Sequence, residues 1–450
     1  ENTSSMVLGA IEYEPDSYLY KPFTKDLLRS RLEKVLKKKL SLNAIDEALE
    51  KKDYTTALRL VDQRIDGKPV NLAELIRLKG DICIRSGDYE EAAAIYERVL
   101  AAREMTWARM GLGKVHYGLK QYDAARDTFQ ELINNNNRFT AAYDWLARSL
   151  KAMGDLNGSQ EVLTAAVKIS PKAILRQQEL GEIAIENKDY NIAEKAFSQA
   201  VNLGKHSIHN HPKIYARLAE SKVSNDENKN KQSAFKVIEQ MRREFKGSQE
   251  ADLYATITAA TVHRELGEEE KAKESLAQAE HLYDQIGTNA SSELTLSMAT
   301  INAKLGNEEK AKSLFHTVIK NNHDDDELLR NVEAAFNEAG LSESASELIH
   351  NTRNEIVELN NKGVSLVSNG HIVEAIGLFE KAVEGMRGNR TINLNAAKVL
   401  IMSMEKNGLQ TEYIRKTRQY LESVRKLDPD YQGLPKLHDR LKSLVSKMSV

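Results

Sequence analysis

The chain has 450 residues, of which 41% are hydrophobic and 29% are charged, and its formal net charge is −2 at pH 7. This balance excludes an overall positive field that would attract the chain to nucleic acid or to an anionic membrane. No apolar run approaches the roughly 18 residues that span a bilayer, and a single cysteine, Cys83, allows no internal disulfide. We therefore expect a cytoplasmic protein with no membrane and no nucleic acid among its partners.

Residues 1–37 differ from the rest of the chain and are interpreted as a helix that ends near Gly9 and Ala10, a short strand and a second helix. The strand is placed at residues 17–20, before the sequence Lys21-Pro22-Phe23. The second helix is predicted over Thr24–Lys38, with the threonine as its N-cap. The basic run Lys34–Lys39 is interpreted as the solvated C-terminal turn of this helix, where cations favour the negative end of the helix dipole.

These residues resemble the last third of a response-regulator receiver domain. The resemblance implies that Lys21 matches the lysine that pairs with the phosphoryl group, and that the peptide bond before Pro22 is cis. It also implies that Tyr18 matches the aromatic residue that changes rotamer on activation. The family's acidic pair, acceptor aspartate and switch hydroxyl would lie upstream of Glu1, so we expect the chain to begin inside a truncated receiver domain. Truncation would leave a strand edge with unpaired backbone groups and one apolar face. We expect a second copy of the chain, the first repeats or the missing fragment to cover them.

From residue 38 onwards, a turn residue, an alanine and a bulky apolar residue recur with a period of 33 to 34 residues. Gly87, Ala92 and Tyr96 recur first as Lys120, Ala125 and Phe129, then as Gly154, Ser159 and Leu163, and then as Lys188, Ala193 and Phe197. This period resembles the tetratricopeptide repeat (TPR), a pair of antiparallel helices that buries its apolar face only by stacking on its neighbours.

The predicted fold is therefore all-α: a right-handed TPR-type α-solenoid of about ten to eleven helical hairpins, preceded by the α/β receiver fragment. Within it we distinguish N-terminal units over 38–205, an irregular unit with a long loop over 206–252, C-terminal units over 253–430 and a capping helix over 431–450. The segment 224–232 is polar and lacks periodicity, which predicts the long loop.

No sequence motif indicates an enzyme, a cofactor or a metal site. His206, His209 and His211 crowd one turn, but no cysteine or nearby carboxylate completes a ligand set, which favours an exposed polar turn. The run His323–Glu327 precedes a helix and lacks the alternating ligands of a calcium loop, which favours helix capping.

The predicted binding surface is the concave face, built from the first helix of each repeat. An aromatic and methionine patch beside a basic strip suits a peptide with apolar anchors and some acidic residues. Ordinary packing between repeats is the alternative interpretation of Trp107 and Met110. The predicted groove residues are Arg77, Asp81, Trp107, Met110, Lys114, Tyr117, Asp144, Arg148 and Lys151.

Receiver and repeats together resemble response regulators whose output module is a TPR array. The resemblance implies a non-enzymatic scaffold of a two-component phosphorelay that binds proteins or peptides and is phosphorylated through a histidine kinase. One alternative is a phosphorylation-independent adaptor or assembly chaperone that uses the receiver remnant to form a homodimer. RNA binding is a third interpretation, which the mixed charge of the groove disfavours.

Overall fold

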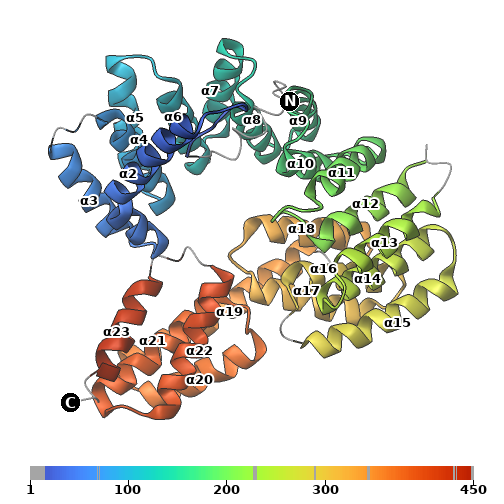
Figure 1. The fold of residues 1–450 in the computed structure, drawn as a ribbon. Helices are drawn as coiled ribbons and strands as arrows, with labels where there is room; N and C mark the ends of the chain where they lie inside the picture. Colours follow the sequence, from blue (N-terminus) through green and yellow to red (C-terminus); the bar gives the residue numbers. More distant parts are fainter. Residues whose placement is uncertain are drawn as a thin grey trace. The chain divides into compact units, whose positions relative to one another are not determined.

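The computed structural model describes residues 16–67, 69, 71–226, 231–287, 290–341, 345–428, 431 and 433–446. Over these residues the chain forms 22 α-helices and no strand, and most helices follow one another as antiparallel pairs (Figure 1). The chain divides into two compact units, the first of which ends at Ser233 and the second of which begins at Ala234.

The first unit contains the helices α2 (Lys25–Glu50), α3 (Tyr54–Asp66), α4 (Leu72–Ser86), α5 (Tyr89–Ala102), α6 (Thr106–Gly118), α7 (Tyr122–Asn135), α8 (Thr140–Ala152), α9 (Leu156–Ile169), α10 (Ile174–Glu186), α11 (Tyr190–Gly204) and α12 (Pro212–Ser224). Next come α13 (Ser233–Glu244), α14 (Gln249–Glu265), α15 (Glu269–Ile286), α16 (Ser292–Lys304), α17 (Glu308–Asn321), α18 (Asp326–Glu338), α19 (Ala345–Ser368), α20 (Ile372–Gly385), α21 (Arg390–Asn407), α22 (Thr411–Leu427) and α23 (Leu434–Ser446).

Each repeat of the first unit consists of an A helix and a B helix. The A helices are α4, α6, α8 and α10, and the B helices are α5, α7, α9 and α11. An A helix packs on its own B helix, and the B helix packs on the next A helix. Neighbouring A helices also touch directly in the pairs α4–α6 and α6–α8. Consecutive A helices therefore lie side by side and share one surface.

The turn between an A helix and its B helix explains the first member of the repeated sequence pattern. Gly87 and Lys120 end their A helices with φ values of 78° and 60°, in the left-handed region that reverses the chain direction. The residue after the turn caps the B helix in several repeats. The backbone N–H of Glu91 donates to Asp88 Oδ1 at 3.2 Å, and that of Gly158 donates to Asp155 Oδ1 at 2.9 Å.

The close approach of the two helices explains the other two members of the pattern. Ala125 and Phe129 on α7 are both fully buried. The ring of Phe129 lies against Gly113 on α6, where an added Cβ would come within 2.6 Å of it. Phe197 on α11 lies against Gly181 on α10 with the same 2.6 Å clearance. A small residue therefore faces a large ring at these helix contacts.

The predicted strand at residues 17–20 is wrong, because these residues have no regular structure and no strand forms anywhere in the described ranges. An extended segment needs a neighbouring strand to pair its backbone groups, and the described part of the chain offers none. The expected cis bond is present between Lys21 and Pro22. The helix expected to end near Gly9 and Ala10 lies outside the described residues.

The helix predicted over Thr24–Lys38 begins as expected but is longer than expected. The Thr24 hydroxyl accepts a hydrogen bond from the Leu27 N–H at 3.2 Å. The helix then continues to Glu50, because neither glycine nor proline interrupts residues 25–50 and because Ile45 and Ala48 are buried in the first hydrophobic cluster. The basic run Lys34–Lys39 therefore lies in the middle of α2 and not in a C-terminal turn.

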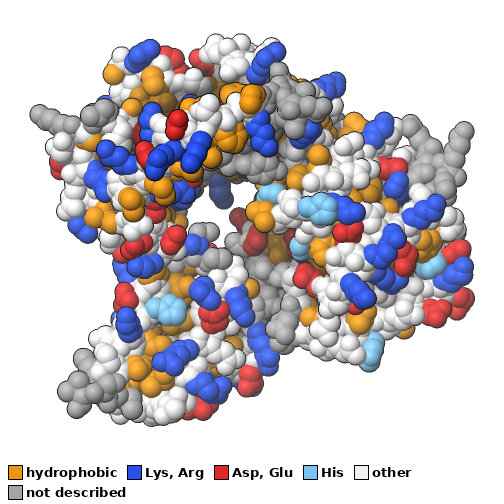
Figure 2. Space-filling model, in the orientation of Figure 1, with side chains coloured by type: hydrophobic (Ala, Val, Ile, Leu, Met, Phe, Trp, Pro, Cys, Tyr) orange, Lys and Arg blue, Asp and Glu red, His pale blue; other side chains and the backbone are white. Residues whose placement is uncertain are grey.

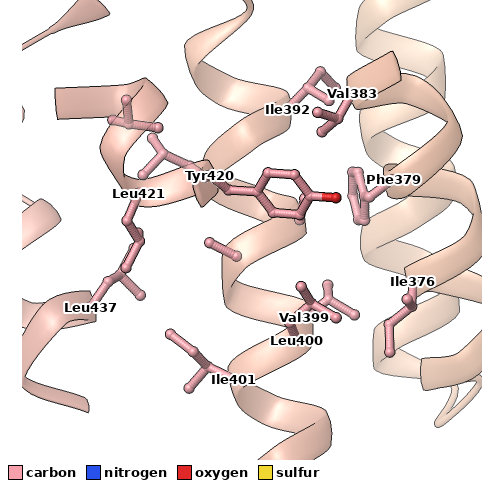
Figure 3. Packing of buried hydrophobic residues seen from close by; sticks show 14 of the residues in the cluster. Ile376, Phe379, Val383, Ile392, Val399, Leu400, Ile401, Tyr420, Leu421 and Leu437 are labelled. Atoms are coloured by element: carbon pink, nitrogen blue, oxygen red, sulfur yellow. The ribbon is translucent and has the colours of Figure 1, made fainter. Parts of the chain in front are cut away.

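In the second unit, two consecutive repeats share α19, a single helix of 24 residues. The polar segment predicted as a long loop joins α12, which ends at Ser224, to α13, which begins at Ser233. At the C-terminal end, side chains from α20, α21, α22 and α23 meet in one apolar cluster, in which Phe379 faces Tyr420 and Leu421 lies near Leu437 (Figure 3). The predicted last helix is thus present as α23.

Two glycine-to-alanine substitutions should have opposite effects on the free energy of unfolding. Gly181→Ala places a methyl group against the Phe197 ring and should destabilise the chain by about 1–3 kcal/mol. Gly377→Ala, on α20, meets no atom within 4 Å and should stabilise it by about 0.5–1 kcal/mol, because alanine is the better helix former. Urea unfolding followed by circular dichroism measures both. Equal effects would contradict the tight Gly181–Phe197 contact.

Candidate functional site

The predicted groove residues lie on three neighbouring A helices, α4, α6 and α8, whose common surface with α10 we call the A-helix face. Residues 77 and 81 lie on α4, residues 107, 110, 114 and 117 on α6, and residues 144, 148 and 151 on α8. Because these positions are three or four residues apart, they share one side of each helix. The A-helix face then gains residues of α10 that the sequence analysis did not single out.

Trp107 and Met110 take part in packing between repeats. Trp107 is half-buried and meets the fully buried Tyr96 edge to face, with 6.2 Å between ring centroids. Met110 has only 7% of its surface exposed and belongs to the cluster that contains Phe129 and Leu146. The packing interpretation therefore fits both residues, and Met110 contributes little to the groove surface.

The centre of the A-helix face is an aromatic–cation cluster formed by Tyr117 and Trp145 with Lys114 and Arg148. The Tyr117 and Trp145 rings meet edge to face at 5.4 Å. The Lys114 ammonium and the Arg148 guanidinium lie 5.5 and 5.1 Å from the centroid of the Trp145 ring. Both distances are within the range of cation–π attraction. Trp145 stacks in turn on the buried Phe129 at 6.0 Å, which fixes the ring in place.

The predicted binding surface did not include Trp145, because it consisted of positions 2, 5, 9 and 12 of the first helix of each repeat. Trp145 is the sixth residue of α8. The usable signal was its spacing from Arg148, which is three residues and therefore about one turn of helix. A second signal was its rarity, because the chain has only two tryptophans.

Ion pairs connect α8 to α10 across the A-helix face. Arg176 donates to Asp144 through Nε at 2.6 Å and through Nη2 at 2.8 Å, and its side chain is only 4% exposed. Arg148 donates to Glu179 at 3.2 Å, and Lys151 donates to Glu186 at 2.8 Å. Burial raises the pKa of the Glu179 carboxyl, and the attraction of Arg148 opposes that rise. The predicted cations Arg148 and Lys151 are therefore each paired with a carboxylate of the next repeat.

A pocket of about 330 Å³ continues this surface between α10 and α12. Its lining combines the exposed Leu175, the floor residues Phe197 and Ile214, and a charged rim. On that rim Glu182 lies 3.3 Å from the Arg217 guanidinium and 4.0 Å from the Lys213 ammonium. The nearby carboxylates Glu182 and Glu220 raise the pKa of Arg217, so the arginine stays charged.

At the other end of the A-helix face, Arg77 and Asp81 contact each other on α4. Their side chains lie 3.8 Å apart, and Asp81 accepts a hydrogen bond from the Tyr96 hydroxyl at 3.1 Å. Burial and the negative charge of Asp81 raise the pKa of this tyrosine. Asp81 is thus occupied in holding a core residue.

The receiver-like residues lie on the segment before α2. Tyr18 is half-buried, and its ring meets that of Tyr20 edge to face at 5.0 Å. Lys21 and Pro22 are exposed.

The histidine turn at residues 206–211 and the acidic run at residues 323–327 each contribute a helix cap. The ring Nδ1 of His211 accepts the Lys213 N–H at the start of α12, while Asp325 caps α18 by accepting the Leu328 N–H at 3.0 Å. No set of three metal-ligating side chains occurs within the described ranges. In the same part of the chain, no helix combines the length and the apolar character that crossing a bilayer requires.

Comparison with known proteins identifies the repeat. Two family models described as tetratricopeptide repeat match residues 83–149 and residues 140–172. No curated protein matches the chain. Solved structures that resemble it include MamA from Desulfovibrio magneticus RS-1, which is 24% identical, covers 37% of this chain and 94% of its own, and has a TM-score of 0.31.

Two further similar structures are TPR proteins. The C-terminal part of a TPR repeat-containing protein from Cytophaga hutchinsonii is 14% identical, covers 57% of this chain and 99% of its own, and has a TM-score of 0.42. A tetratricopeptide repeat protein from Parabacteroides merdae is 15% identical, with coverages of 57% and 95% and a TM-score of 0.35. The two family models show that residues 83–172 of this chain are tetratricopeptide repeats, and further α-helices precede and follow them.

Proposed function

We propose that the chain is a protein-interaction scaffold and that its first unit binds a peptide segment of another protein along the A-helix face. The tetratricopeptide match at residues 83–172 includes the aromatic–cation cluster. Repeats of this kind present a continuous surface over several units, which suits an extended or helical peptide. The ligand class then follows from the side chains on that surface.

The observation that carries the proposal is the position of two cations over one tryptophan. Lys114 makes no ion pair with any described residue, while Arg148 is paired with Glu179. An incoming carboxylate would find Lys114 available beside the ring, and a neighbouring apolar side chain would contact Tyr117 and Trp145. We infer a ligand segment in which an acidic residue stands next to an aromatic or aliphatic one.

The same surface argues against nucleic acid as the ligand. Glu179, Glu182 and Glu186 follow one another along α10 and interrupt the cations of α8 and α12. A phosphate backbone requires a continuous positive track and would be repelled here. A short peptide, in contrast, needs a complementary charge on the protein only where one of its own charged side chains binds.

Lys114→Glu should weaken peptide binding at least tenfold, because it replaces the available cation with a charge that repels the ligand carboxylate. The probe is a peptide selected by the full chain from a random display library, and its dissociation constant is measured by fluorescence anisotropy. Lys172→Glu makes the same charge change at an exposed residue between α9 and α10 and is the matched control. Equal affinity of both variants for the peptide would refute the assignment of Lys114.

Asp144→Ala should destabilise the first unit by about 2–4 kcal/mol, because it removes the carboxylate that neutralises the buried Arg176. Lys151→Ala removes a more exposed pair, with both side chains 36% accessible, and should cost less than about 1 kcal/mol. Thermal unfolding of each variant, followed by circular dichroism, gives the comparison. Similar losses would show that the Asp144–Arg176 pair has no special role.

A second, finer proposal is that the natural protein is a response regulator whose receiver controls this array. The sequence Lys21-Pro22-Phe23, followed directly by a helix capped at Thr24, supports it. The test incubates the natural protein, including any residues before Glu1, with a phosphorylated histidine kinase and follows phosphate transfer. Transfer together with altered peptide affinity supports the switch. An upstream sequence without an acceptor aspartate would instead favour an adaptor that works without phosphorylation.

A further inference from the structure

The first sixteen residues of α2, residues 25–40, form a segment that we call the basic arm. Every residue of the arm is exposed except Leu28 and Val35, which are half-buried. Leu32, Leu36 and Leu40 expose 52%, 58% and 76% of their surface. The packing of the repeats begins only with the second half of α2, at Leu42 and Ile45. The arm is thus a helix whose apolar side chains lack a cover in the described part of the chain.

The exposed leucines lie on a different side of α2 from the face that packs on α3. The arm's apolar stripe contains every fourth residue: Leu28, Leu32, Leu36 and Leu40. The packing face contains Leu42, Ile45, Ala48 and Leu49. Successive residues of a helix differ by about 100°, so the centres of the stripe and the packing face lie roughly 150° apart around the axis. The stripe is therefore not an extension of the repeat's own interface.

The arm also carries a strong local positive charge. It holds seven lysines and arginines but only two acids, Asp26 and Glu33, which gives it a charge of +5. Three cations are satisfied within the chain, in the pairs Arg29–Glu33, Lys38–Glu74 and Lys39–Asp16. Charges on a protein surface are screened beyond about 8–10 Å, so a partner at the arm responds to this local charge and not to the overall −2.

We propose that the basic arm docks on an anionic lipid surface, with its leucine stripe in the headgroup region and its cations on the lipid phosphates. Charge complementarity selects an anionic occupant and disfavours a second copy of the arm, since two segments with a net positive charge repel each other. Basic amphipathic helices with exposed leucines bind lipid interfaces in this way. Figure 2 shows Lys and Arg side chains mixed with apolar ones over this part of the first unit.

The position of the cations favours lipid over an acidic protein groove. Lys25, Arg29 and Lys39 lie in the same sector of the helix as the leucine stripe, by the same 100° geometry. In a protein groove these cations would be buried and would each require a partner. At a lipid interface their long side chains extend back to the headgroups while the leucines enter the apolar layer.

The test is cosedimentation of the full chain with vesicles of phosphatidylcholine and phosphatidylserine in a 3:1 ratio, at 0.1 M NaCl. We expect binding to these vesicles, and at least tenfold weaker binding at 0.5 M NaCl or with phosphatidylcholine alone. Lys25→Glu/Arg29→Glu, at two cations in the sector of the stripe, and Leu32→Ser/Leu36→Ser should each weaken binding at least tenfold. All four residues are exposed, so circular dichroism should show an unchanged helical content.

The matched control is Arg59→Glu/Lys172→Glu, which makes the same charge change at exposed residues outside the arm and should bind as the unaltered chain does. Absence of vesicle binding overturns the proposal. Equal losses in control and arm variants overturn it as well. So does a loss confined to the charge variant, because the leucines would then have no part in binding.

Discussion

The architecture depends on one contact, in which a helix glycine lies directly against an aromatic ring of the partner helix. Gly113 with Phe129 and Gly181 with Phe197 show it in the first unit, and Gly363 with Phe379 shows it in the second. The ring occupies the space that a side chain would take, so the two helices approach closely and the ring is removed from water. Gly113 and Gly181 lie two repeat periods apart, and the repeat between them places Ala147 and Leu163 at the equivalent positions, so a small residue against a bulky one sets how each of these A helices is presented.

The functional surface is a by-product of that packing. Trp145 is held by Phe129, the ring that also closes its repeat, and this leaves the Trp145 ring in contact with Lys114 and Arg148. Ion pairs between α8 and α10 then fix the long cationic side chains in defined directions. A preorganised surface loses less side-chain entropy when a ligand binds, which favours specific recognition.

Local chemistry made the repeats predictable from sequence. The left-handed turn, the small contact residue and the bulky ring each depend on one residue type at one position, so Gly87, Ala92 and Tyr96 identified a repeat directly. The strand at residues 17–20 failed because a strand depends on a neighbour that its own sequence does not contain. The ion pairs of the site were not foreseen for a similar reason: Arg176 meets Asp144 across 32 residues, and only the stacking of α10 on its neighbours brings them together.

The shared helix α19 has a consequence for how force and motion pass through the second unit. In the first unit, a loop joins α5 to α6 and another joins α7 to α8, so the angle between these successive repeats can adjust through a few backbone torsions. Residues 345–368 instead form one continuous rod that serves as the B helix of one repeat and the A helix of the next. Bending there would break main-chain hydrogen bonds within a helix. Rotation of these two repeats relative to each other would therefore have to bend a helix, which costs more than turning backbone torsions in a loop.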